Sequence, residues 1–301
     1  MKAIISTRSG SADHLQLQDV DRPVPKDDEI LVKVHVASVT IGDVNLRHLN
    51  PLFKLFFILG GFPTMRIPGV EMSGDVEAVG KNVRNFKVGD QVFGTTTGQR
   101  YGGNAEYVCV PEVSKHGMVI KKPDGVTFEE VVALSAGAVT ALQLLKKAGI
   151  EKGDDVLIYG ASGSVGTFAV QLAKVLWDAH VTGVCSGRNA DLVMSLGADE
   201  VVDYTKEDFT ERDRRYDVIF DAVNKMPRSK RRKALKPDGK YQTVFTPTKE
   251  VPEDLAFLAD LVKEGKLRAH IDRAYTLEQV PDAHRYVESG RKRGNIIVNV
   301  I

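Results

Sequence analysis

The sequence is poor in cysteine and has no surplus charge of either sign. Its 301 residues include two cysteines, Cys109 and Cys185, too few for a disulfide framework or a four-thiolate zinc cluster, so we expect a reducing compartment. Lys and Arg number 41 against 40 Asp and Glu, a formal net charge of +1, so no overall field attracts nucleic acid or an acidic membrane. With 43% hydrophobic and 27% charged residues, a disordered chain is excluded and two folded domains are expected.

Long hydrophobic runs are also lacking. The longest apolar stretch, residues 49–62, is interrupted by Pro51 and Lys54 and falls short of the ~20 residues of a membrane span. Its phenylalanines allow two interpretations that the sequence leaves open, an apolar substrate lid or a core helix. The first residues, MKAIISTRSG, lack an apolar core with a cleavage site, so no signal peptide is predicted. We expect a soluble, cytoplasmic protein without a membrane span.

The first third of the chain has the pattern of short strands separated by Gly and Asp turns. Residues 30–39 are rich in β-branched side chains, and 75–79 and 91–93 follow the same pattern, which indicates a small β-barrel or sandwich. Near residue 125 the spacing becomes helical, and a helix is predicted over 128–148 with Gly149 as its C-cap. We place a domain boundary there.

From Asp155 onward, apolar strands alternate with helices. Such alternation predicts an α/β domain with a doubly wound parallel sheet covered on both faces. Strands are expected at 156–160, 180–184, 200–204, 217–221 and 240–245, and helices at 164–177, 189–198 and 227–235. Two further helices, at 252–264 and 279–289, and a last strand at 296–301 complete the chain.

The segment VLIYGASGSVGTFAVQLAK, residues 156–174, carries the clearest functional pattern. Ala161, Gly163 and Gly166 occupy the first, third and sixth positions of a small-x-Gly-x-x-Gly turn between a strand and a helix. A pyrophosphate would approach the bare backbone at Gly163, and Gly166 would let the helix pack on its strand, with the helix N-terminus aimed at negative charge. A tight turn alone would also explain the glycines. The flanking strand and helix favour a dinucleotide site.

The end of the next strand, HVTGVCSGRNADL, indicates which dinucleotide binds. NAD enzymes usually place Asp or Glu about 20 residues beyond the glycine turn, whereas this chain has Cys185 and Ser186 there. Ser186 and Arg188 are suited to bind an extra phosphate, which a carboxylate would repel. The sequence therefore favours NADPH over NADH, although Arg188 is also explained as a solvated arginine at a helix start.

These motifs resemble the zinc-independent quinone oxidoreductase branch of the medium-chain dehydrogenases/reductases. The blocks that match include DEILVKVHVASV, IPGVEMSGDVEAVGKNVRNFKVGDQVFG, GGNAEYVCVP, DVIFDAV and RGNIIVNV. The resemblance implies a GroES-like β-rich catalytic domain over 1–124, completed by 266–301, and a Rossmann NADPH domain over 125–265, with the active site in the cleft. The cofactor-binding residues that it implies are Thr140, Ala161, Ser162, Gly163, Ser164, Val165, Gly166, Ser186, Arg188, Tyr204, Val223 and Phe245.

The departures from the superfamily concern zinc. In zinc alcohol dehydrogenases the IPGVEMSG block carries a histidine ligand where Val70 stands, and the early cysteine ligand is replaced at or near Thr40. A tetrahedral zinc site cannot be assembled from what remains, so no metal is predicted. Without a Lewis acid, hydride transfer from NADPH to a quinone or an α,β-unsaturated carbonyl is favoured over alcohol oxidation.

Other features leave alternatives open. Thr40 and Asp43 are the candidate residues of the substrate cleft, with turn capping as the alternative for Asp43, and the catalytic residue and proton donor stay unassigned. A stretch missing after KYQTVF predicts a monomer or an atypical homodimer. The basic run at 225–233 lacks interleaved aromatics, which indicates a solvated helix face and no nucleic-acid partner. Alternative functions are a metal-free alcohol or aldehyde reductase and a catalytically silent NADPH-binding sensor.

Overall fold

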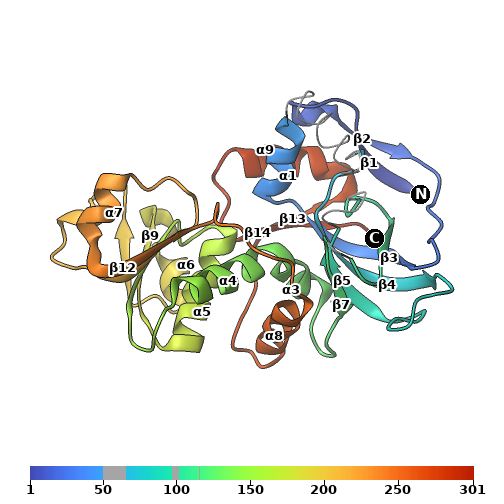
Figure 1. Cartoon of the computed structure of the whole chain (residues 1–301). Helices are drawn as coiled ribbons and strands as arrows, with labels where there is room; N and C mark the ends of the chain where they lie inside the picture. The colour runs from blue at the N-terminus through green and yellow to red at the C-terminus, as the bar shows by residue number, and fades with distance from the viewer. Residues whose placement is uncertain (50–65, 97–101, 115) are drawn as a thin grey trace. The chain divides into compact units, whose positions relative to one another are not determined.

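The computed structural model describes residues 1–49, 66–96, 102–114 and 116–301, which form two compact units (Figure 1). The first unit comprises Met1–Ala136, Glu250–Lys263 and Ile271–Ile301, and the second comprises Gly137–Lys249 and Glu264–His270. Most of the apolar stretch at 49–62 lies outside the described residues, so its two interpretations stay predictions.

The first unit is β-rich, as predicted. A two-stranded ribbon, β1 (Lys2–Ser6) and β2 (Leu15–Asp19), accompanies a larger sheet ordered β13-β14-β3-β4-β5-β7, with β6 also paired to β3. Every second residue from Ile30 to Val34 of β3 belongs to the main core of this unit, as the two-residue repeat of a strand directs. The sheet strands are β3 (Glu29–Ser38), β4 (Glu71–Val79), β5 (Gln91–Thr95), β6 (Tyr107–Pro111), β7 (Val119–Lys121), β13 (Ile271–Thr276) and β14 (Asn295–Asn299).

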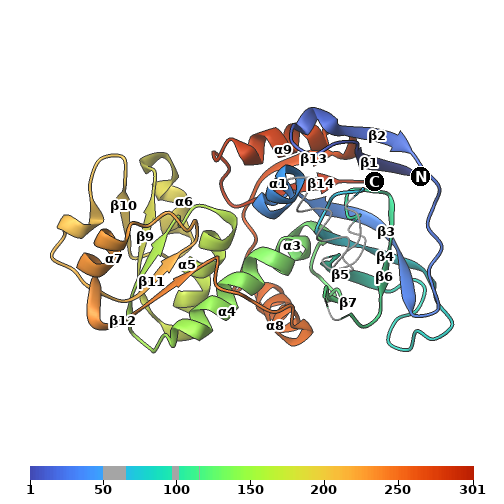
Figure 2. The same ribbon diagram turned by 45° about the horizontal axis from the view of Figure 1, so that its top comes forward.

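The carboxyl-terminal segment is part of the first unit. Strand β14 pairs antiparallel with β3, and α9 (Val280–Glu288) contacts α1 (Ile41–His48), as Figure 2 shows. Arg47 of α1 donates a 2.6 Å hydrogen bond to Glu288 of α9, which joins segments far apart in the sequence. Helix α8 (Pro252–Lys263) contacts β7.

The first unit ends later than expected from the sequence. The expected boundary at residue 124 precedes α3 (Phe128–Val132), whereas the structure divides the chain after Ala136. The reason is packing: Val132 belongs to a buried cluster with Val36 and Ile297, and the Phe128 carbonyl accepts a 3.0 Å hydrogen bond from the Ser73 hydroxyl. Helix α3 thus packs in the first unit, with Val131 and Val132 fully buried.

The second unit is fully described and contains a parallel sheet ordered β10-β9-β8-β11-β12. This is the strand order of a Rossmann-type doubly wound domain without its sixth strand, so the predicted fold class is confirmed. Its strands are β8 (Asp155–Tyr159), β9 (His180–Cys185), β10 (Glu200–Asp203), β11 (Tyr216–Asp221) and β12 (Leu235–Thr243).

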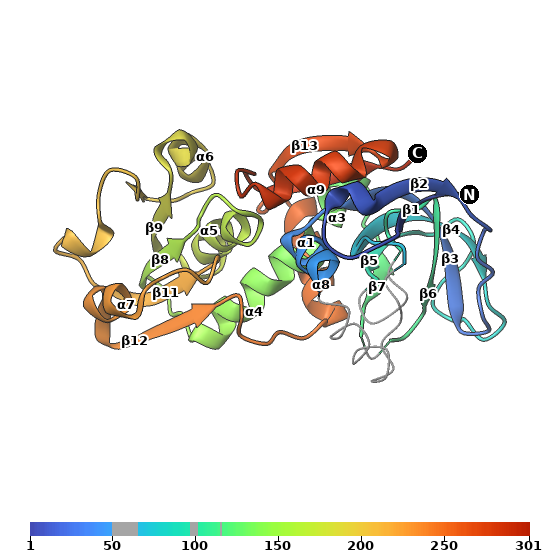
Figure 3. The same cartoon turned by 90° about the horizontal axis from the view of Figure 1, so that it is seen from above.

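Helices cover this sheet (Figure 3). Helix α5 contacts β8 and β9, while α4 contacts α5, β11 and β12; Phe168 of α5 and Phe220 of β11 are fully buried. The helices are α4 (Val139–Ala148), α5 (Ser164–Trp177), α6 (Ala190–Ser195) and α7 (Arg228–Ala234). Gly149 caps α4 in the left-handed conformation, at φ 66°, as predicted.

The helix predicted over 128–148 is interrupted by a π-helical turn, Leu134–Ala138. The amide of Ala136 donates to Glu71 Oε1 at 2.6 Å, so a buried carboxylate takes a backbone donor that a regular helix would use internally. Within the described ranges, 128–148 is the one helical stretch long and apolar enough to cross a membrane, but 72% of its most apolar 18-residue window is buried. Core helices of soluble proteins are often equally long and apolar, so length and composition alone are weak evidence for a membrane span.

Candidate functional site

The turn after β8 is shaped by three glycines. Gly160 has φ 83°, and a Cβ on it would lie 2.7 Å from Val223 Cγ1. A Cβ on Gly166 would lie 2.2 Å from the Gly160 carbonyl oxygen, so the close helix–strand packing predicted at Gly166 is present. A Cβ on Gly163 would meet only the Gly160 oxygen, at 3.5 Å. The backbone of Gly163 is therefore open to a group that approaches from outside.

Gly163 is the N-cap of α5 and has extended backbone angles, φ −82° and ψ 177°. The amides of Gly160 and Ala161 donate to the Val184 carbonyl at 3.0 and 3.1 Å, which fixes the turn to β9. The first amides of a helix have no acceptor within it, and the helix dipole adds positive potential there. The N-terminus of this 14-residue helix thus suits an anionic pyrophosphate.

Asn189 links the glycine turn to the end of β9. Its amide nitrogen donates to Ser162 Oγ at 3.0 Å and to Ser186 Oγ at 3.2 Å. Asn189 is 5% exposed, and its buried Oδ1 has no hydrogen-bond partner among the described residues. The structure thus groups two hydroxyls with an unsatisfied polar atom, a set that fits a polar ligand. Sequence reasoning missed Asn189, because only the fold brings Ser162 close to it.

Arg188 and Tyr204 flank this group. Ser186 and Tyr204 directly follow Cys185 and Asp203, which are paired residues of β9 and β10, and the Tyr204 amide donates to the Cys185 carbonyl at 3.1 Å. Tyr204 is 58% exposed, and Arg188 is also exposed. Both side chains are therefore accessible to a ligand at the carboxyl ends of these strands.

A carboxylate does lie beside this site, contributed by the third strand. A Cβ on Gly187 would lie 2.3 Å from Asp203 Oδ2, and Asp203 Oδ1 accepts from the amide and hydroxyl of Thr205 at 3.0 and 2.7 Å. Hydrogen bonds from Thr205 and the Gly187 amide lower the pKa of Asp203. The expectation of no carboxylate at this site was based on the residues at the end of β9 alone. It therefore missed Asp203 of β10, whose oxygens accept hydrogen bonds within the protein.

Asp221, at the end of β11, shapes the opposite side of the turn. This fully buried carboxylate accepts from the amides of Val223 and Met226 at 3.1 and 2.8 Å and from the Tyr241 hydroxyl at 3.0 Å. It thereby holds Val223 against Gly160. Asp221 was not singled out from the sequence, although an acid that ends an apolar strand before a turn was the available signal.

The remaining predicted residues of the second unit lie at the ends of its elements. Thr140 is half-buried in the first turn of α4, and Phe245 follows β12 with 76% of its surface exposed. Ser162, Ser164 and Val165 are half-buried in the turn and the start of α5, whereas Ala161 is fully buried. All twelve predicted cofactor residues thus belong to the second unit.

Thr40 and Asp43, the candidate cleft residues of the first unit, form a capping box at the start of α1. The Thr40 hydroxyl donates to Asp43 Oδ2 at 2.7 Å and accepts from the Asp43 amide at 3.2 Å. The Asp43 carboxylate also accepts from the amides of Gly69 and Val70, while burial raises its pKa. The Thr40 proton is therefore engaged by Asp43, and Asp43 makes the capping contacts that the sequence left open as its alternative role.

Glu71 is a buried carboxyl group that the sequence did not single out. Burial raises its pKa to about 7, although it accepts from the Ser38 hydroxyl and the Ala136 amide. Asp43 raises this pKa further and Lys292 lowers it. Burial in turn lowers the pKa of Lys292 to about 8.

Among the described residues, no three His, Cys, Asp or Glu side chains converge as metal ligands would.

Two protein-family models match the chain. Residues 26–124 match the alcohol dehydrogenase GroES-like domain. Residues 196–251 and 225–298 match a family described as zinc-binding dehydrogenase.

Relatives that match almost the whole of this chain are named as oxidoreductases or reductases. The chain is 33% identical to the chloroplast envelope quinone oxidoreductase homolog of Arabidopsis thaliana, over 96% of this chain and 95% of that protein. It is 32% identical to the 2-methylene-furan-3-one reductase of Solanum lycopersicum, over 100% of this chain and 79% of that protein. Further relatives carry names that specify NADPH or NAD(P)H.

A solved structure has the same fold. The quinone oxidoreductase from Coxiella burnetii superposes with a TM-score of 0.85 and 28% sequence identity, covering 100% of this chain and 99% of that one.

Proposed function

This chain belongs to the medium-chain dehydrogenase/reductase superfamily, an oxidoreductase family that uses a nicotinamide cofactor, and from that premise we propose that it reduces quinones or α,β-unsaturated carbonyls with NADPH and without zinc. The observation that carries the proposal is the site in the second unit. There the open backbone of Gly163 and the start of α5 suit a pyrophosphate, and Asn189 groups Ser162 with Ser186.

The choice of NADPH rests on the residues at the end of β9. Ser186 and the exposed Arg188 would hold the extra phosphate by charge-assisted hydrogen bonds. Asp203 is the carboxylate that would oppose it; its oxygens face donors of Thr205 and Gly187, and Lys206 Nζ lies 3.9 Å from its Oδ2, which partly offsets its charge. Bound NADPH would supply the hydride from its nicotinamide ring. The protein supplies the orientation of the dinucleotide.

Activated C=C bonds and quinones are more suitable substrates for this chain than saturated alcohols, because its described residues offer no cluster of metal ligands. Oxidation of an alcohol profits from a Lewis acid that lowers the pKa of its hydroxyl, and Val70 and the engaged Thr40 offer no such ligand set. Reduction of a conjugated bond needs mainly a well-placed acceptor and a proton, which solvent supplies in this proposal. The printed names of the relatives, quinone oxidoreductase and 2-methylene-furan-3-one reductase, fit that chemistry.

The test follows NADPH absorbance with a panel of quinones, enones, aldehydes and saturated alcohols, with and without a chelator. We expect oxidation of NADPH with quinones or enones, unchanged by chelation. Turnover limited to aldehydes and alcohols would identify a metal-free carbonyl reductase instead. Tight NADPH binding without turnover on any acceptor would identify a sensor protein, and loss of activity on chelation would contradict the zinc-free proposal.

A further inference from the structure

A groove lined by cations lies between α7 and the start of β12. Its volume is about 900 Å³, and its charged lining consists of Arg215, Arg228, Arg231, Arg232 and Lys236. We call this feature the basic groove. It contains four arginines of a chain whose formal net charge is only +1, so positive charge is concentrated there locally.

The basic groove is distinct from the nucleotide site of the second unit. Strands β8, β11 and β12 are parallel, so their amino ends lie together on one side of the sheet and their carboxyl ends on the other. Leu235 begins β12 and lines the groove, and Arg215 directly precedes β11. The glycine turn follows the end of β8. The basic groove therefore lies at the amino ends of these strands, and the nucleotide site lies at their carboxyl ends.

Local backbone structure shapes the groove. Tyr216 pairs with Leu235, but the next partners are Val218 and Lys240, so residues 236–239 bulge out of the sheet. A Cβ on Gly239 would lie 2.8 Å from the Tyr216 carbonyl oxygen, which shows how closely the bulge returns to β11. The Arg231 guanidinium lies 4.4 Å from the centre of the Tyr241 ring. This contact fixes one wall of the groove.

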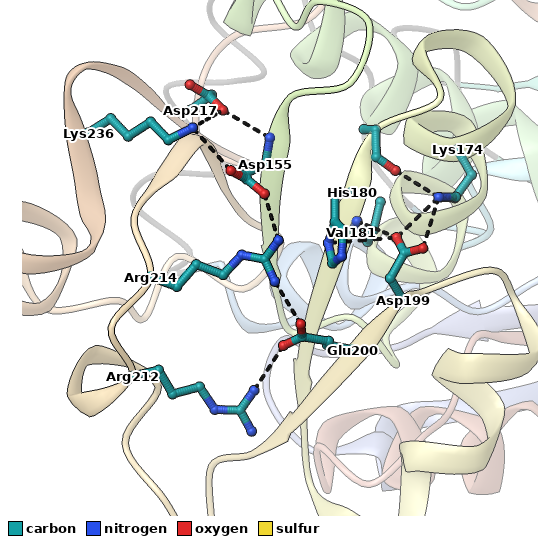
Figure 4. Close-up of polar contacts among 11 residues, drawn as sticks. Asp155, Lys174, His180, Val181, Asp199, Glu200, Arg212, Arg214, Asp217 and Lys236 are labelled. Atoms are coloured by element: carbon teal, nitrogen blue, oxygen red, sulfur yellow. Dashed lines mark hydrogen bonds and ion pairs between the residues drawn. The ribbon is translucent and has the colours of Figure 1, made fainter.

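Most other cations of this region are paired with carboxylates. Lys230 and Lys233 of α7 pair with Asp208 at 2.8 Å and Glu211 at 2.6 Å. At the starts of the strands, Arg214 bridges Asp155 and Glu200, Arg212 contacts Glu200, and Lys236 bridges Asp155 and Asp217 (Figure 4).

The four groove arginines differ from these paired cations. In the part of the chain that the structure describes, no carboxylate lies within ion-pair distance of Arg215, Arg228, Arg231 or Arg232. Arg215 donates to a backbone carbonyl, that of Arg214, at 3.1 Å. Asp238, the acid within the bulge, is not among the residues that line the groove. Among the described residues, the four arginines therefore lack a counter-charge, whereas Lys236, the fifth cation of the groove, is paired with Asp155 and Asp217.

We propose that the basic groove binds a compact anion with two or more phosphate groups. Guanidinium groups form paired hydrogen bonds to phosphate oxygens, and a volume of about 900 Å³ lies within the range of small-molecule sites. No aromatic side chain is among the described residues that line the groove, so it offers no platform for stacked nucleic-acid bases. The ligand class is thus a multiply phosphorylated small molecule.

Tripolyphosphate is the probe for this proposal, titrated calorimetrically into the full-length protein at physiological ionic strength. The variant Arg228→Gln/Arg232→Gln removes two unpaired charges from the groove. The control, Lys230→Gln/Lys233→Gln, removes the same charge from the same helix but only from lysines that are already paired. We expect affinity to fall about tenfold or more in the arginine variant, by the loss of charge-assisted bonds, and less than about twofold in the control.

The outcomes separate the possibilities. Equal losses in the two variants would show a general charge effect and overturn the proposal, as would the absence of tripolyphosphate binding to the wild type. Probe binding confined to the nucleotide site would leave the arginine variant unchanged and overturn it as well. Tighter binding of duplex DNA than of tripolyphosphate, lost in the arginine variant, would show a nucleic-acid surface instead. Thermal unfolding of both variants checks that each remains folded.

Discussion

Gly166 packs so closely on Gly160 that a Cβ on Gly166 would lie 2.2 Å from the Gly160 carbonyl oxygen. The first turn of α5 and the end of β8 are therefore held together by backbone contact. This contact aims the N-terminus of α5 past Gly163, whose own backbone remains open.

The two glycines are expected to respond differently to alanine. Gly166→Ala forces α5 away from β8 and should cost about 1–3 kcal/mol of stability as well as nucleotide affinity. At Gly163 there is space for a methyl group, and the φ of −82° is allowed for alanine. The stability of Gly163→Ala should therefore be close to that of the wild type. Its NADPH affinity should nevertheless fall about tenfold or more if the methyl group displaces the pyrophosphate from the amides. Urea unfolding and NADPH titration measure the two effects, and wild-type affinity in Gly163→Ala would mean that the pyrophosphate binds elsewhere.

Glu71 should make the stability of the first unit depend on pH. Its folded pKa of about 7 lies above the ordinary 4.5, so the native state binds this proton more tightly than the unfolded chain does. The associated stability is full below pH 4.5 and is lost as pH rises through 7, by up to about 3 kcal/mol. Glu71→Gln cannot ionise, so its stability relative to the wild type should increase between pH 5 and pH 8.

The measurement for Glu71 is the urea midpoint at four pH values in that interval. Glu253→Gln, on the exposed face of α8, is the matched control and should follow the wild-type profile. A constant difference between Glu71→Gln and the wild type across the interval would show that Glu71 ionises normally.

The ion pair between α1 and α9 should contribute to stability. The Arg47 side chain is 2% exposed and that of Glu288 is 43% exposed, so Glu288→Gln leaves a buried guanidinium without its counter-charge. We expect a loss of about 1–3 kcal/mol in the free energy of unfolding. Asp282→Asn breaks the exposed pair with Arg285 and should cost less than about 1 kcal/mol. Equal effects of the two substitutions would contradict the buried role of Arg47.

The free edge at β12 favours a monomer. Strand β12 pairs only with β11 in the second unit, and its first half carries Lys236, Pro237 and a bulge. Proline lacks an amide donor, and bulges and lysines hinder the pairing of edge strands. Light scattering should therefore give the mass of one chain. A stable dimer whose interface protects β12 amides from hydrogen exchange would refute this expectation.

The Rossmann-type unit was predictable because its signals are local. The glycine turn, the C-cap at Gly149 and the alternation of strands and helices each depend on neighbouring residues. Predicted element bounds differ from the structure by a few residues, as at α7 (Arg228–Ala234) against the expected 227–235.

What the sequence did not show depends on contacts between distant segments. The π-turn arises because Glu71 takes the Ala136 amide, a partner 65 positions away in the chain. Asn189 meets Ser162, and Asp203 meets Gly187, only after the parallel strands have aligned. Propensity alone also favours an unbroken helix over 128–148, which the buried carboxylate overrides.

Cofactor discrimination at Ser186 and Arg188 is the central claim, and paired titrations of NADPH and NADH test it most directly. The wild type should bind NADPH more tightly than NADH. Arg188→Ala should weaken NADPH binding by about 1.5–3 kcal/mol, the strength of a charge-assisted hydrogen bond, and leave NADH binding unchanged. Tighter binding of NADH by the wild type, or equal losses for both dinucleotides in Arg188→Ala, would contradict the account.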